Sequence, residues 1–443
     1  MIERIIFMQP RTDAGRNYIN SFGAEQTWTP WFALTLAPIA ERSGLQVELL
    51  DARVTPGWAE LLERLSDTDL LAISVMTGNA IRDAVKASTI ARERGAKVIW
   101  GGPHVSLFPE QTLKEAPVDA VVPGFGYQPF AALVHQIRSD RWPTQGIVTS
   151  TCADGLVTLE QPVPVGSDSK TFDSVSLDLI QDWSPYLNSD IAIADRTANL
   201  ITSEGCSRKC TYCSEPKTSG GEWLTSDVSL LTAVAVDIRE RSGANGFKLH
   251  DPNFFDDAAR ASVFAAGFAR ALGLPWAATM HPADLSNLTE RQLRGFADTG
   301  LRRVLVGLES PDPRLVRLAG KQYDPSRIPE LAKKLASAGI RGMFTFIVGW
   351  PAADPDHYEN TVTCAKGLLD IWPEHQAKIH FLEPWPGTPI FRLLVRQGFE
   401  SPASLHEWAD IDYYQARYAS IHDARKVDFI RHSNQELSPY VDA

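Results

Sequence analysis

The segment Ser203-Glu204-Gly205-Cys206-Ser207-Arg208-Lys209-Cys210-Thr211-Tyr212-Cys213 holds three of the five cysteines in this chain of 443 residues. It directly follows an expected strand at Thr197–Thr202. Three thiolates this close together on one loop can each bind one iron of a cubane iron–sulfur cluster, which leaves the fourth iron open to a small molecule. Zinc is the alternative, but it normally takes a fourth Cys or His nearby, and the nearest downstream histidine is His250. The spacing therefore favours a cluster held by Cys206, Cys210 and Cys213.

Before this segment, short apolar runs alternate with amphipathic stretches of helical periodicity. The expected strands are Arg4–Met8, Gln46–Asp51, Leu70–Val75, Lys97–Trp100 and Ala120–Val122. The expected helices are Pro30–Ser43, Trp58–Ser66, Ala80–Arg94, Pro109–Glu115 and Gln128–Asp140. Strands that alternate with helices predict an α/β fold, here a doubly wound, Rossmann-like domain over residues 1–140. Ligands of such sheets bind at the carboxyl ends of the strands.

After residue 190 the same alternation returns and continues to residue 400. The expected strands are Thr197–Thr202, Gly246–His250, Trp276–Met280, Arg303–Leu308, Met343–Val348 and Lys378–Leu382. The helices between them are Asp227–Arg241, Ala258–Leu272, Thr289–Thr299, Ile328–Ala338 and His357–Leu369. Six strand–helix units predict a partial (β/α)6 barrel of the TIM type over residues 191–400.

The regions around this barrel break the alternation. Residues 141–190 are expected to be a linker with a small hairpin, formed by Gly146–Thr151 and Leu156–Glu160 and turning at Ala153-Asp154-Gly155. Residues 401–443 are polar and aromatic, and they are expected to cap the barrel mouth.

Composition limits the partners and the compartment. The chain has 43 Lys+Arg and 54 Asp+Glu, a net charge of −11, so nucleic acid and anionic membrane surfaces are disfavoured. The start, Met1-Ile2-Glu3-Arg4-Ile5-Ile6-Phe7, does not read as a signal peptide, and no apolar run reaches the roughly 18 residues of a membrane helix. Five cysteines do not make a disulfide framework, and Cys152 and Cys364 are expected to be structural thiols. A reducing cytoplasm is the expected location.

The cysteine spacing, with the aromatic Tyr212 before the third cysteine, resembles the radical S-adenosylmethionine (SAM) superfamily over about residues 190–400. The resemblance implies that Cys206, Cys210 and Cys213 hold a [4Fe-4S] cluster whose open iron is chelated by the amine and carboxylate of SAM. Reductive cleavage of SAM would give a 5′-deoxyadenosyl radical, which abstracts hydrogen from a small polar substrate. An electron donor of the flavodoxin or ferredoxin type, or a separate reductase, is implied as a partner.

The resemblance also assigns SAM contacts to the ends of other barrel strands. The second strand ends in Lys248-Leu249-His250-Asp251-Pro252-Asn253-Phe254-Phe255, where relatives grip the amino group of SAM, although His250 departs from their acidic pattern. Ribose and adenine contacts are implied for Glu309 and Ser310 after the fourth strand, for Val348, Gly349 and Trp350 after the fifth, and for Tyr212. Polar residues at strand ends can also simply solvate a barrel mouth, so both interpretations stay open.

The first domain resembles the cobalamin (B12)-binding type of domain that precedes many radical SAM enzymes. The likeness lies in Asp51-Ala52, Ser74-Val75-Met76-Thr77, Gly101-Gly102-Pro103-His104 and Gly124-Phe125-Gly126-Tyr127. There is no D-x-H-x-x-G motif, and Gly-Phe-Gly-Tyr stands where relatives usually have Gly-Glu-Gly-Glu. Cobalamin binding and a purely structural role therefore both stay open, and His104 is expected to bond within its loop rather than to bind a metal.

The reaction after hydrogen abstraction has two readings within this family. The first expectation is a cobalamin-independent dehydration or deoxygenation of an aminoglycoside or sugar diol, of the diol-dehydratase type in antibiotic or other secondary-metabolite biosynthesis. Such a lyase needs a proton donor and acceptor, for which the loops offer Glu204, Glu215, Lys217, His250 and Asp251. The acidic chain suits a polycationic substrate. The alternatives are a cobalamin-dependent C-methyltransferase and, in another class, an iron–sulfur electron carrier or sensor.

Overall fold

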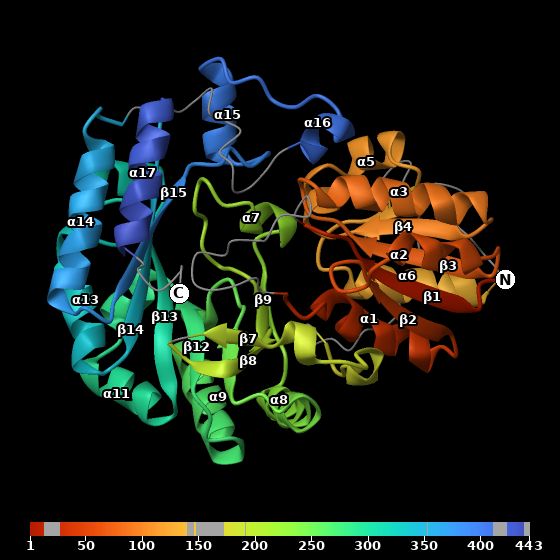
Figure 1. The fold of residues 1–443 in the computed structure, drawn as a ribbon, viewed down its shortest axis with the longest axis horizontal. Helices are drawn as coiled ribbons and strands as arrows, with labels where there is room; N and C mark the ends of the chain where they lie inside the picture. Colours follow the sequence, from red (N-terminus) through yellow and green to blue (C-terminus); the bar gives the residue numbers. More distant parts are fainter. Residues whose placement is uncertain are drawn as a thin grey trace.

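The computed structural model describes residues 1–12, 27–139, 146–147, 172–190, 192–351, 353–410 and 423–437. Two α/β units lie side by side, the N-terminal unit in red to orange and the C-terminal unit in green to blue (Figure 1). Within the described ranges, no helix combines the length and apolar character needed to cross a membrane.

The N-terminal unit is built on one parallel sheet. Its strands are β1 (Arg4–Gln9), β2 (Gln46–Asp51), β3 (Asp69–Ser74), β4 (Lys97–Gly101), β5 (Ala120–Val122) and β6 (Gly146–Ile147). They lie in the order β2-β1-β3-β4-β5-β6, and every neighbouring pair is parallel. This is the doubly wound order in which the chain reverses direction beside β1, and the loops at that reversal form a crevice at the carboxyl ends.

Helices cover both faces of this sheet. They are α1 (Trp31–Arg42), α2 (Trp58–Leu61), α3 (Ala80–Glu93), α4 (Pro103–Leu107), α5 (Pro109–Glu115) and α6 (Tyr127–Arg138), with a 3-10 turn η1 (Leu62–Arg64). Alternate strand residues belong to two apolar clusters: Ile5 and Phe7 pack with α1 and α6, whereas Ile6 and Met8 pack on the side of α3. The doubly wound domain predicted from the sequence is confirmed, and its strand bounds differ from the expected ones by a residue at most.

The C-terminal unit holds a sheet that curls into a half-barrel (Figure 1). Its strands are β7 (Asn188–Asp190), β8 (Ala194–Leu200), β11 (Gly246–Leu249), β12 (Trp276–Met280), β13 (Leu301–Glu309), β14 (Arg341–Val348) and β15 (Gln376–Phe381). Their order is β15-β14-β13-β12-β11-β8-β7, parallel except for the antiparallel β7–β8 pair. A separate antiparallel pair, β9 (Ser203–Gly205) and β10 (Trp223–Thr225), follows β8. The partial barrel is thereby confirmed.

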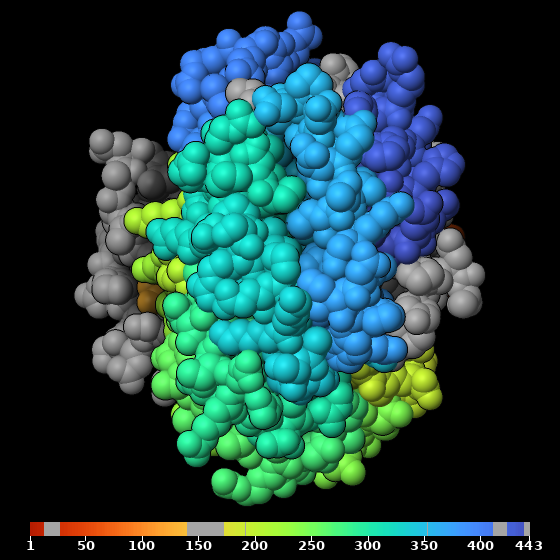
Figure 2. All heavy atoms as spheres, turned by 90° about the vertical axis from the view of Figure 1, so that its left-hand side faces the viewer, coloured from red at the N-terminus to blue at the C-terminus, as the bar shows by residue number. Residues whose placement is uncertain are grey.

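Helices pack against the outer face of the half-barrel, where segments coloured green to blue form the surface seen in Figure 2. The long ones are α8 (Val228–Ser242), α9 (Ala258–Ala271), α11 (Glu290–Asp298), α13 (Ile328–Ser337), α14 (His357–Ile371) and α17 (Ala424–Leu437). Short ones are α7 (Glu215–Thr218), α10 (Pro282–Asn287), α12 (Pro313–Leu318), α15 (Pro389–Arg396) and α16 (Leu405–Ala409), with 3-10 turns η2 (Leu177–Leu179), η3 (Ser184–Tyr186), η4 (Phe254–Asp256) and η5 (Pro325–Arg327). Asp227, Asp257 and Thr289 cap the helices that follow them, because each side chain accepts backbone N–H groups of the first turn.

Two regions differ from the sequence prediction. Gly146–Ile147 pairs with β5 as the sixth strand of the N-terminal sheet rather than lying in a linker, and the remainder of the expected hairpin lies outside the described residues. The described part of the tail does not cap the barrel mouth. Trp408 of α16 belongs to the apolar core of the N-terminal unit, and α17 packs on α14 and β15. Burial of Trp408, only 1% exposed, outweighs any contact at the mouth.

The two units share side-chain contacts. Trp31 and Leu34 of α1 belong to the same apolar cluster as barrel residues such as Leu200. The Asn199 Oδ1 of β8 accepts the Thr29 backbone N–H at 3.0 Å and the Trp31 indole N–H at 3.3 Å. These buried bonds fix the entry to α1 against the half-barrel.

A buried ion pair closes the lower part of the half-barrel. Arg303 donates to both carboxylate oxygens of Asp190 at 2.8 and 2.7 Å, and both side chains are nearly inaccessible. Asp190→Ala would leave a buried guanidinium without its carboxylate, so we expect a loss of about 3–5 kcal/mol in the free energy of unfolding. Thermal or denaturant unfolding measures this. Glu290→Ala, which breaks the exposed Arg294–Glu290 pair, is the control and should cost at most about 1 kcal/mol; equal losses for both variants would contradict the assignment.

Candidate functional site

The three cysteines follow β9 on a loop that the half-barrel holds at both ends. Cys206 and Cys213 are half-buried, Cys210 is buried, and all three are free thiols. The loop is fixed to the α12 region because the Thr211 N–H donates to the Ala319 carbonyl at 3.0 Å and the Thr211 Oγ1 to the Leu318 carbonyl at 2.6 Å. At its end, the backbone N–H of Glu215 points at the Cys213 Sγ at 3.4 Å.

The thiols lie close enough to influence one another. Burial raises the pKa of Cys206 to about 11 and that of Cys213 to about 12, and the neighbouring thiols add to each shift. Burial also raises the pKa of Cys210, whereas Lys321 lowers it. Thiols with raised pKa values remain protonated until a metal takes the place of the proton. Among the described residues, no group of three or more His, Cys, Asp or Glu is spaced to hold a metal ion. A cube of four irons holds its cysteine sulfurs further apart than a single ion does, so this donor set fits a cluster.

Asp251 ties the start of the cysteine loop to the end of β11. One carboxylate oxygen accepts the Thr202 N–H at 2.7 Å, and the other accepts the hydroxyls of Ser203, at 2.6 Å, and of Thr202. Its backbone carbonyl accepts the Thr279 hydroxyl. Because both carboxylate oxygens are engaged within the protein, the geometry makes Asp251 a positioning residue for the loop. Its expected contacts with SAM and its expected acid–base role stay predictions.

Glu309 lies at the end of β13 in a network with the cysteine loop. Its Oε1 accepts the Tyr212 hydroxyl at 2.6 Å and lies 3.0 Å from the Lys321 Nζ. The backbone φ of Glu309 is 66°, a conformation that a non-glycine residue rarely adopts without other constraints. The shared carboxylate therefore joins β13, the loop and the segment after α12. The ribose contact predicted for Glu309 would require the same carboxylate to bind SAM in addition to Tyr212 and Lys321.

A buried donor near the cysteine loop has no acceptor in the described protein. His281, at the end of β12, accepts the Ala283 N–H on Nδ1 at 3.1 Å, so its ring proton is on Nε2. The Nε2 has no hydrogen-bond partner there, although His281 is only 6% exposed. Burial, together with the charges of Lys321 and Arg208, lowers the pKa of His281 to about 2. A neutral N–H donor beside two cations fits a carboxylate, which SAM carries.

The remaining predicted SAM contacts have partners within the protein. The Asn253 Nδ2 donates to Asp284 at 2.8 Å, and its Oδ1 accepts the His281 N–H at 3.1 Å. The Ser310 Oγ accepts the Asp312 N–H at 3.1 Å. After β14, where Val348 is the last residue, the Gly349 N–H donates to His357, and the Trp350 ring meets Tyr212 edge-on at 5.5 Å. Their cofactor roles stay predictions.

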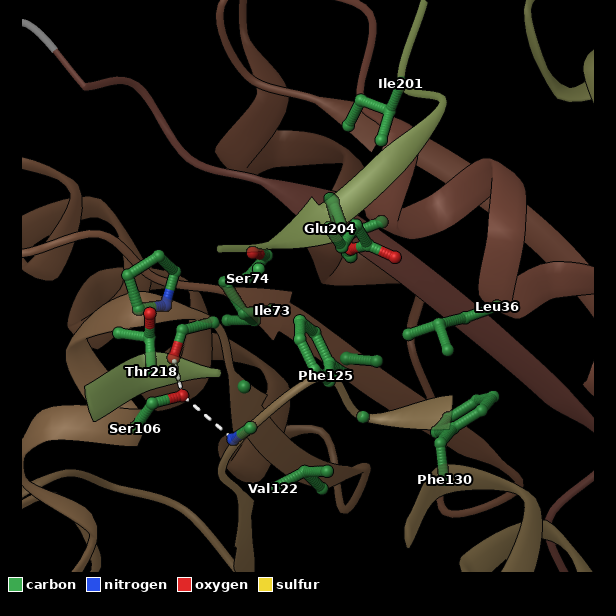
Figure 3. Close-up of a pocket in the computed structure, with 18 of the residues that line it drawn as sticks. Leu36, Ile73, Ser74, Ser106, Val122, Phe125, Phe130, Ile201, Glu204 and Thr218 are labelled. Carbon is green, nitrogen blue, oxygen red and sulfur yellow. Dashed lines mark hydrogen bonds between the residues drawn. The ribbon is translucent and has the colours of Figure 1, made fainter. Parts of the chain in front are cut away.

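A cavity of about 320 Å³ lies where the carboxyl ends of the N-terminal strands face the C-terminal unit. Its lining is mainly apolar and includes residues of two glycine loops. The lining from the N-terminal unit includes Phe7, Phe32, Leu36, Ala72, Ser74, Ile99, Gly102, Ser106, Val122, Gly124 and Phe130, and that from the barrel unit includes Ile201, Glu204, Gly205, Glu215, Thr218 and His250. In Figure 3, Leu36 and Phe130 lie on one side of Phe125, Ser106 and Thr218 on the other, and Glu204 enters from the barrel unit. This volume is within the range of small-molecule and cofactor sites.

The loop Gly124-Phe125-Gly126-Tyr127 connects the cavity to the cysteine loop. The Tyr127 hydroxyl donates to the Glu204 Oε2 at 2.5 Å, and a Cβ on Gly205 would lie 3.0 Å from the Phe125 ring and 2.0 Å from the Glu222 carbonyl. Gly205, at φ +75°, cannot be replaced without moving one of these groups. The aromatic residues that replace the expected carboxylates therefore hold the two units together immediately before Cys206.

His104 does not reach this cavity. It is fully buried, and its Nδ1 lies 3.0 Å from the Thr77 hydroxyl, in agreement with the expected loop hydrogen bond. Burial lowers its pKa to about 4, so its ring is neutral at physiological pH.

The five residues proposed for acid–base chemistry do not all converge. Glu204, Glu215 and His250 line the cavity, whereas Lys217 is exposed and its stem lies against Gly387, and Asp251 is enclosed. Burial raises the pKa of Glu204 to about 7, against the effect of the Tyr127 hydrogen bond, and burial raises that of Glu215.

Sequence reasoning missed two residues near the cysteine loop, His281 and Lys321. His281 directly follows an expected strand and could have been found by its position; Lys321 follows a helix, and nothing in the sequence links it to Glu309.

Both units match known families at the sequence level. Residues 200–365 match the radical SAM superfamily, and residues 22–134 match the B12 binding domain. An uncharacterized methyltransferase of Pyrococcus horikoshii is 26% identical over 351 residues, which cover 78% of this chain and 73% of that protein. The cytidylyl-2-hydroxyethylphosphonate methyltransferase of Streptomyces wedmorensis is 23% identical over 420 residues, which cover 83% of this chain and 78% of that protein.

Solved structures share the whole two-unit fold. The radical SAM methyltransferase TsrM from Kitasatospora setae, with tryptophan and a SAM analogue bound, superposes with a TM-score of 0.69 at 17% identity over 92% of this chain and 82% of that one. The cobalamin-dependent radical SAM enzyme OxsB superposes with a TM-score of 0.67 at 14% identity over 89% of this chain and 61% of that one. Two families in this order, with three free cysteines on the loop after the first parallel strand of the half-barrel, make this chain a radical SAM enzyme with an N-terminal domain of the B12-binding type.

Proposed function

We propose that this enzyme is a cobalamin-dependent methyltransferase that methylates a small molecule. The observation that carries the proposal is the cavity between the two units, which is lined both by the strand ends of the B12-binding-type domain and by Glu204 and Gly205, next to Cys206. A group bound at the strand ends would face the mouth of the half-barrel, because the same cavity is lined from both units.

The lining of the cavity suits the apolar part of a cofactor whose remainder extends into the open space beside the glycine loops. Gly102, Gly124 and Gly126 all have positive φ, and a Cβ on Gly124 or Gly126 would meet nothing within 4 Å, so their backbone faces open space. The Ser106 hydroxyl accepts the Gly124 N–H at 2.9 Å and donates to the Gly102 carbonyl at 2.9 Å, and it thereby joins the two glycine loops. Apolar side chains behind these loops, such as Phe7 and Val122, suit an aromatic base.

When bound, the cluster would supply the electron for SAM cleavage, and cobalamin would supply a carrier for the methyl group. The residues of this chain prepare the site. Cys206, Cys210 and Cys213 would hold the cluster, and Asp251 orients their loop. His281 is placed to donate its Nε2 proton in a hydrogen bond to the SAM carboxylate, and Glu204 is placed to accept a proton at the entrance to the half-barrel.

The relatives favour methyl transfer over the dehydration expected from the sequence. The two curated relatives described above are methyltransferases by name, as is TsrM, whose structure contains tryptophan as its substrate. We propose by analogy a small-molecule substrate for this chain, and a flavodoxin- or ferredoxin-type donor for the electron, in a reducing compartment. Dehydration remains the second candidate because Glu204 and Glu215 lie together on the cavity wall.

Filling the cavity tests the cobalamin site. The protein purified with excess hydroxocobalamin should retain about one corrin per chain, and Leu36→Trp, which places an indole in the cavity, should weaken retention about 10-fold or more. Absorption spectra and mass analysis measure the corrin, and iron content should not change. Leu61→Trp at an exposed site is the matched control. With methyl-labelled SAM, loss of label transfer should accompany loss of corrin; a wild type that retains no corrin, or that forms 5′-deoxyadenosine without any methylated product, would contradict methyl transfer.

Removal of one loop cysteine tests the cluster. Cys210→Ala leaves two ligands of three, so iron and sulfide content after anaerobic reconstitution should fall well below four of each per chain, and SAM cleavage should fall by about 100-fold or more. Elemental analysis and chromatography of the adenosyl products provide the measurements. Cys364→Ala, which removes a free thiol on α14, should keep full iron content. Full SAM cleavage by Cys210→Ala would refute the assignment.

The raised pKa of Glu204 predicts how the stability of the fold depends on pH. Its folded pKa of about 7 lies above the ordinary value of 4.5, so folding favours the protonated form. That contribution is complete below pH 4.5 and is lost as the pH rises through 7, by about 3 kcal/mol. Glu204→Gln should therefore unfold at a temperature that falls less between pH 5 and pH 8, as followed by calorimetry. Exposed Glu222→Gln should behave like the wild type; an unchanged slope in Glu204→Gln would show that Glu204 is not buried in this way.

A further inference from the structure

The segment that follows β15 passes from the barrel unit to the N-terminal unit. We refer to residues 388–410, which contain α15 and α16, as the strap. Figure 1 shows the strap at the top of the view, where α16 lies beside α5, and α16 packs on both α3 and α5. A segment that is fixed at its two ends to different units restrains how those units move against each other.

At its first end the strap is bound to the cysteine loop. The Ile390 N–H donates to the carbonyl of Thr211, the residue that follows the second cysteine of the loop, at 3.1 Å. Ile390 and Leu394 are buried in an apolar cluster with Trp350, and Tyr212 of the loop packs against that cluster. Movement of α15 would therefore disturb the loop between its second and third cysteines.

At its second end the strap is bound to the N-terminal unit. The Trp408 side chain is buried in the apolar cluster of that unit, and its ring lies 4.6 Å from the Phe108 ring between centroids. The Leu405 N–H, at the start of α16, donates to the Glu115 Oε2 of α5 at 2.6 Å. A buried indole is a large apolar anchor, and the hydrogen bond from Leu405 fixes the direction in which α16 leaves the strap.

The contact between Trp408 and Phe108 leads to the cavity between the two units. Phe108 directly follows α4, and its N–H donates to the His104 carbonyl of that helix at 3.0 Å. Pro103 and Ser106 of the same helix line the cavity, and the Ser106 hydroxyl joins the two glycine loops. Because protein interiors are close-packed, a displacement of Trp408 would be transmitted to Phe108 and α4. The strap thus connects the cysteine loop to a wall of the cavity.

We propose that the strap couples the cofactor cavity to the cysteine loop, and that Trp408 is its positioning residue. This inference rests on the proposed function in assigning the cavity to cobalamin. While Trp408 is docked, α4 is held in the position that lines the cavity, and α15 is held against the loop. Because coupling between two sites is reciprocal, a corrin in the cavity must strengthen the docking of the strap by the same factor by which the docked strap strengthens corrin binding.

Hydrogen exchange tests the reciprocal effect without turnover. In the protein with a reconstituted cluster, saturation with hydroxocobalamin should slow the exchange of the α15 and α16 amides about 10-fold. None of residues 388–410, all of which the structure describes, lines the cavity, so contact with a group in the cavity does not account for such an effect. If the strap only buried its own apolar side chains, its exchange would not respond to the corrin. The α17 amides, on the outer face of the half-barrel, are the internal control and should not change.

Matched variants locate the coupling at the anchor. Trp408→Ala should raise the dissociation constant for hydroxocobalamin about 10-fold, as measured by equilibrium dialysis, and should abolish the corrin-dependent slowing of exchange in α15. Trp408→Phe, which keeps a ring against Phe108, should behave nearly like the wild type. Glu115→Ala removes only the acceptor of the Leu405 N–H, outside the apolar core, and should raise the same constant about 3-fold. Exposed Lys114→Ala, on the same helix, is the matched control and should change nothing.

The outcomes separate this inference from the proposed function. A wild type that binds the corrin while exchange in the strap stays the same, or a folded Trp408→Ala that binds the corrin as tightly as the wild type, would overturn the coupling and leave methyl transfer standing. Thermal unfolding shows whether each variant is folded, and Glu115→Ala decides by the same criterion if Trp408→Ala is not. A wild type that binds no corrin would overturn both the proposed function and the coupling.

Discussion

The site depends on one buried carboxylate. Asp251, at the end of β11, accepts three hydrogen bonds from Thr202 and Ser203, which stand at the start of the cysteine loop. A carboxylate buried in this way is stable only when its oxygens are satisfied, so its position and that of the loop determine each other. Because parallel strands end at one edge of the sheet, this bond set places the three thiols above the hollow and beside the ends of β12 and β13.

The second constraint is the joint between the two units. Asn199 fixes the chain before α1, and the Tyr127–Glu204 hydrogen bond fixes the loop after β5 to the residue pair that precedes Cys206. A Tyr–carboxylate bond of 2.5 Å and a glycine with no room for a Cβ leave little freedom for one unit to slide on the other. A cofactor in the cavity and a substrate in the half-barrel would therefore meet in a fixed geometry, which group transfer requires.

Much of this fold follows from periodicity in the sequence. Strands such as β5 and β12 have the expected bounds, because each is a short, largely buried run between polar turns. The cysteine ligands could also be predicted from the sequence, because binding a cluster depends on the spacing of the cysteines along one loop. Three short strands, β7, β9 and β10, were not expected, and Gly146–Ile147 (β6) was expected in a hairpin rather than in the N-terminal sheet. The β7 strand is the polar Asn188-Ser189-Asp190, which no apolar pattern marks, and its Asp190 is held by Arg303. The Lys321–Glu309 pair and the placement of Trp408 on the other unit are tertiary contacts that no local pattern encodes.

The net charge of the chain is a weak guide to the charge that a bound ligand meets. Net charge acts over distances on which salt screens it, about 8–10 Å under physiological conditions, and it describes the solvent-facing surface where most acidic residues lie. A ligand inside the half-barrel meets only the side chains that alternate inward, and there half-buried Lys248 is influenced by both Arg303 and Asp190 because water is partly excluded. The parity of each strand, which the sequence does contain, identifies the side chains that such a ligand would meet, whereas the sum over the chain does not.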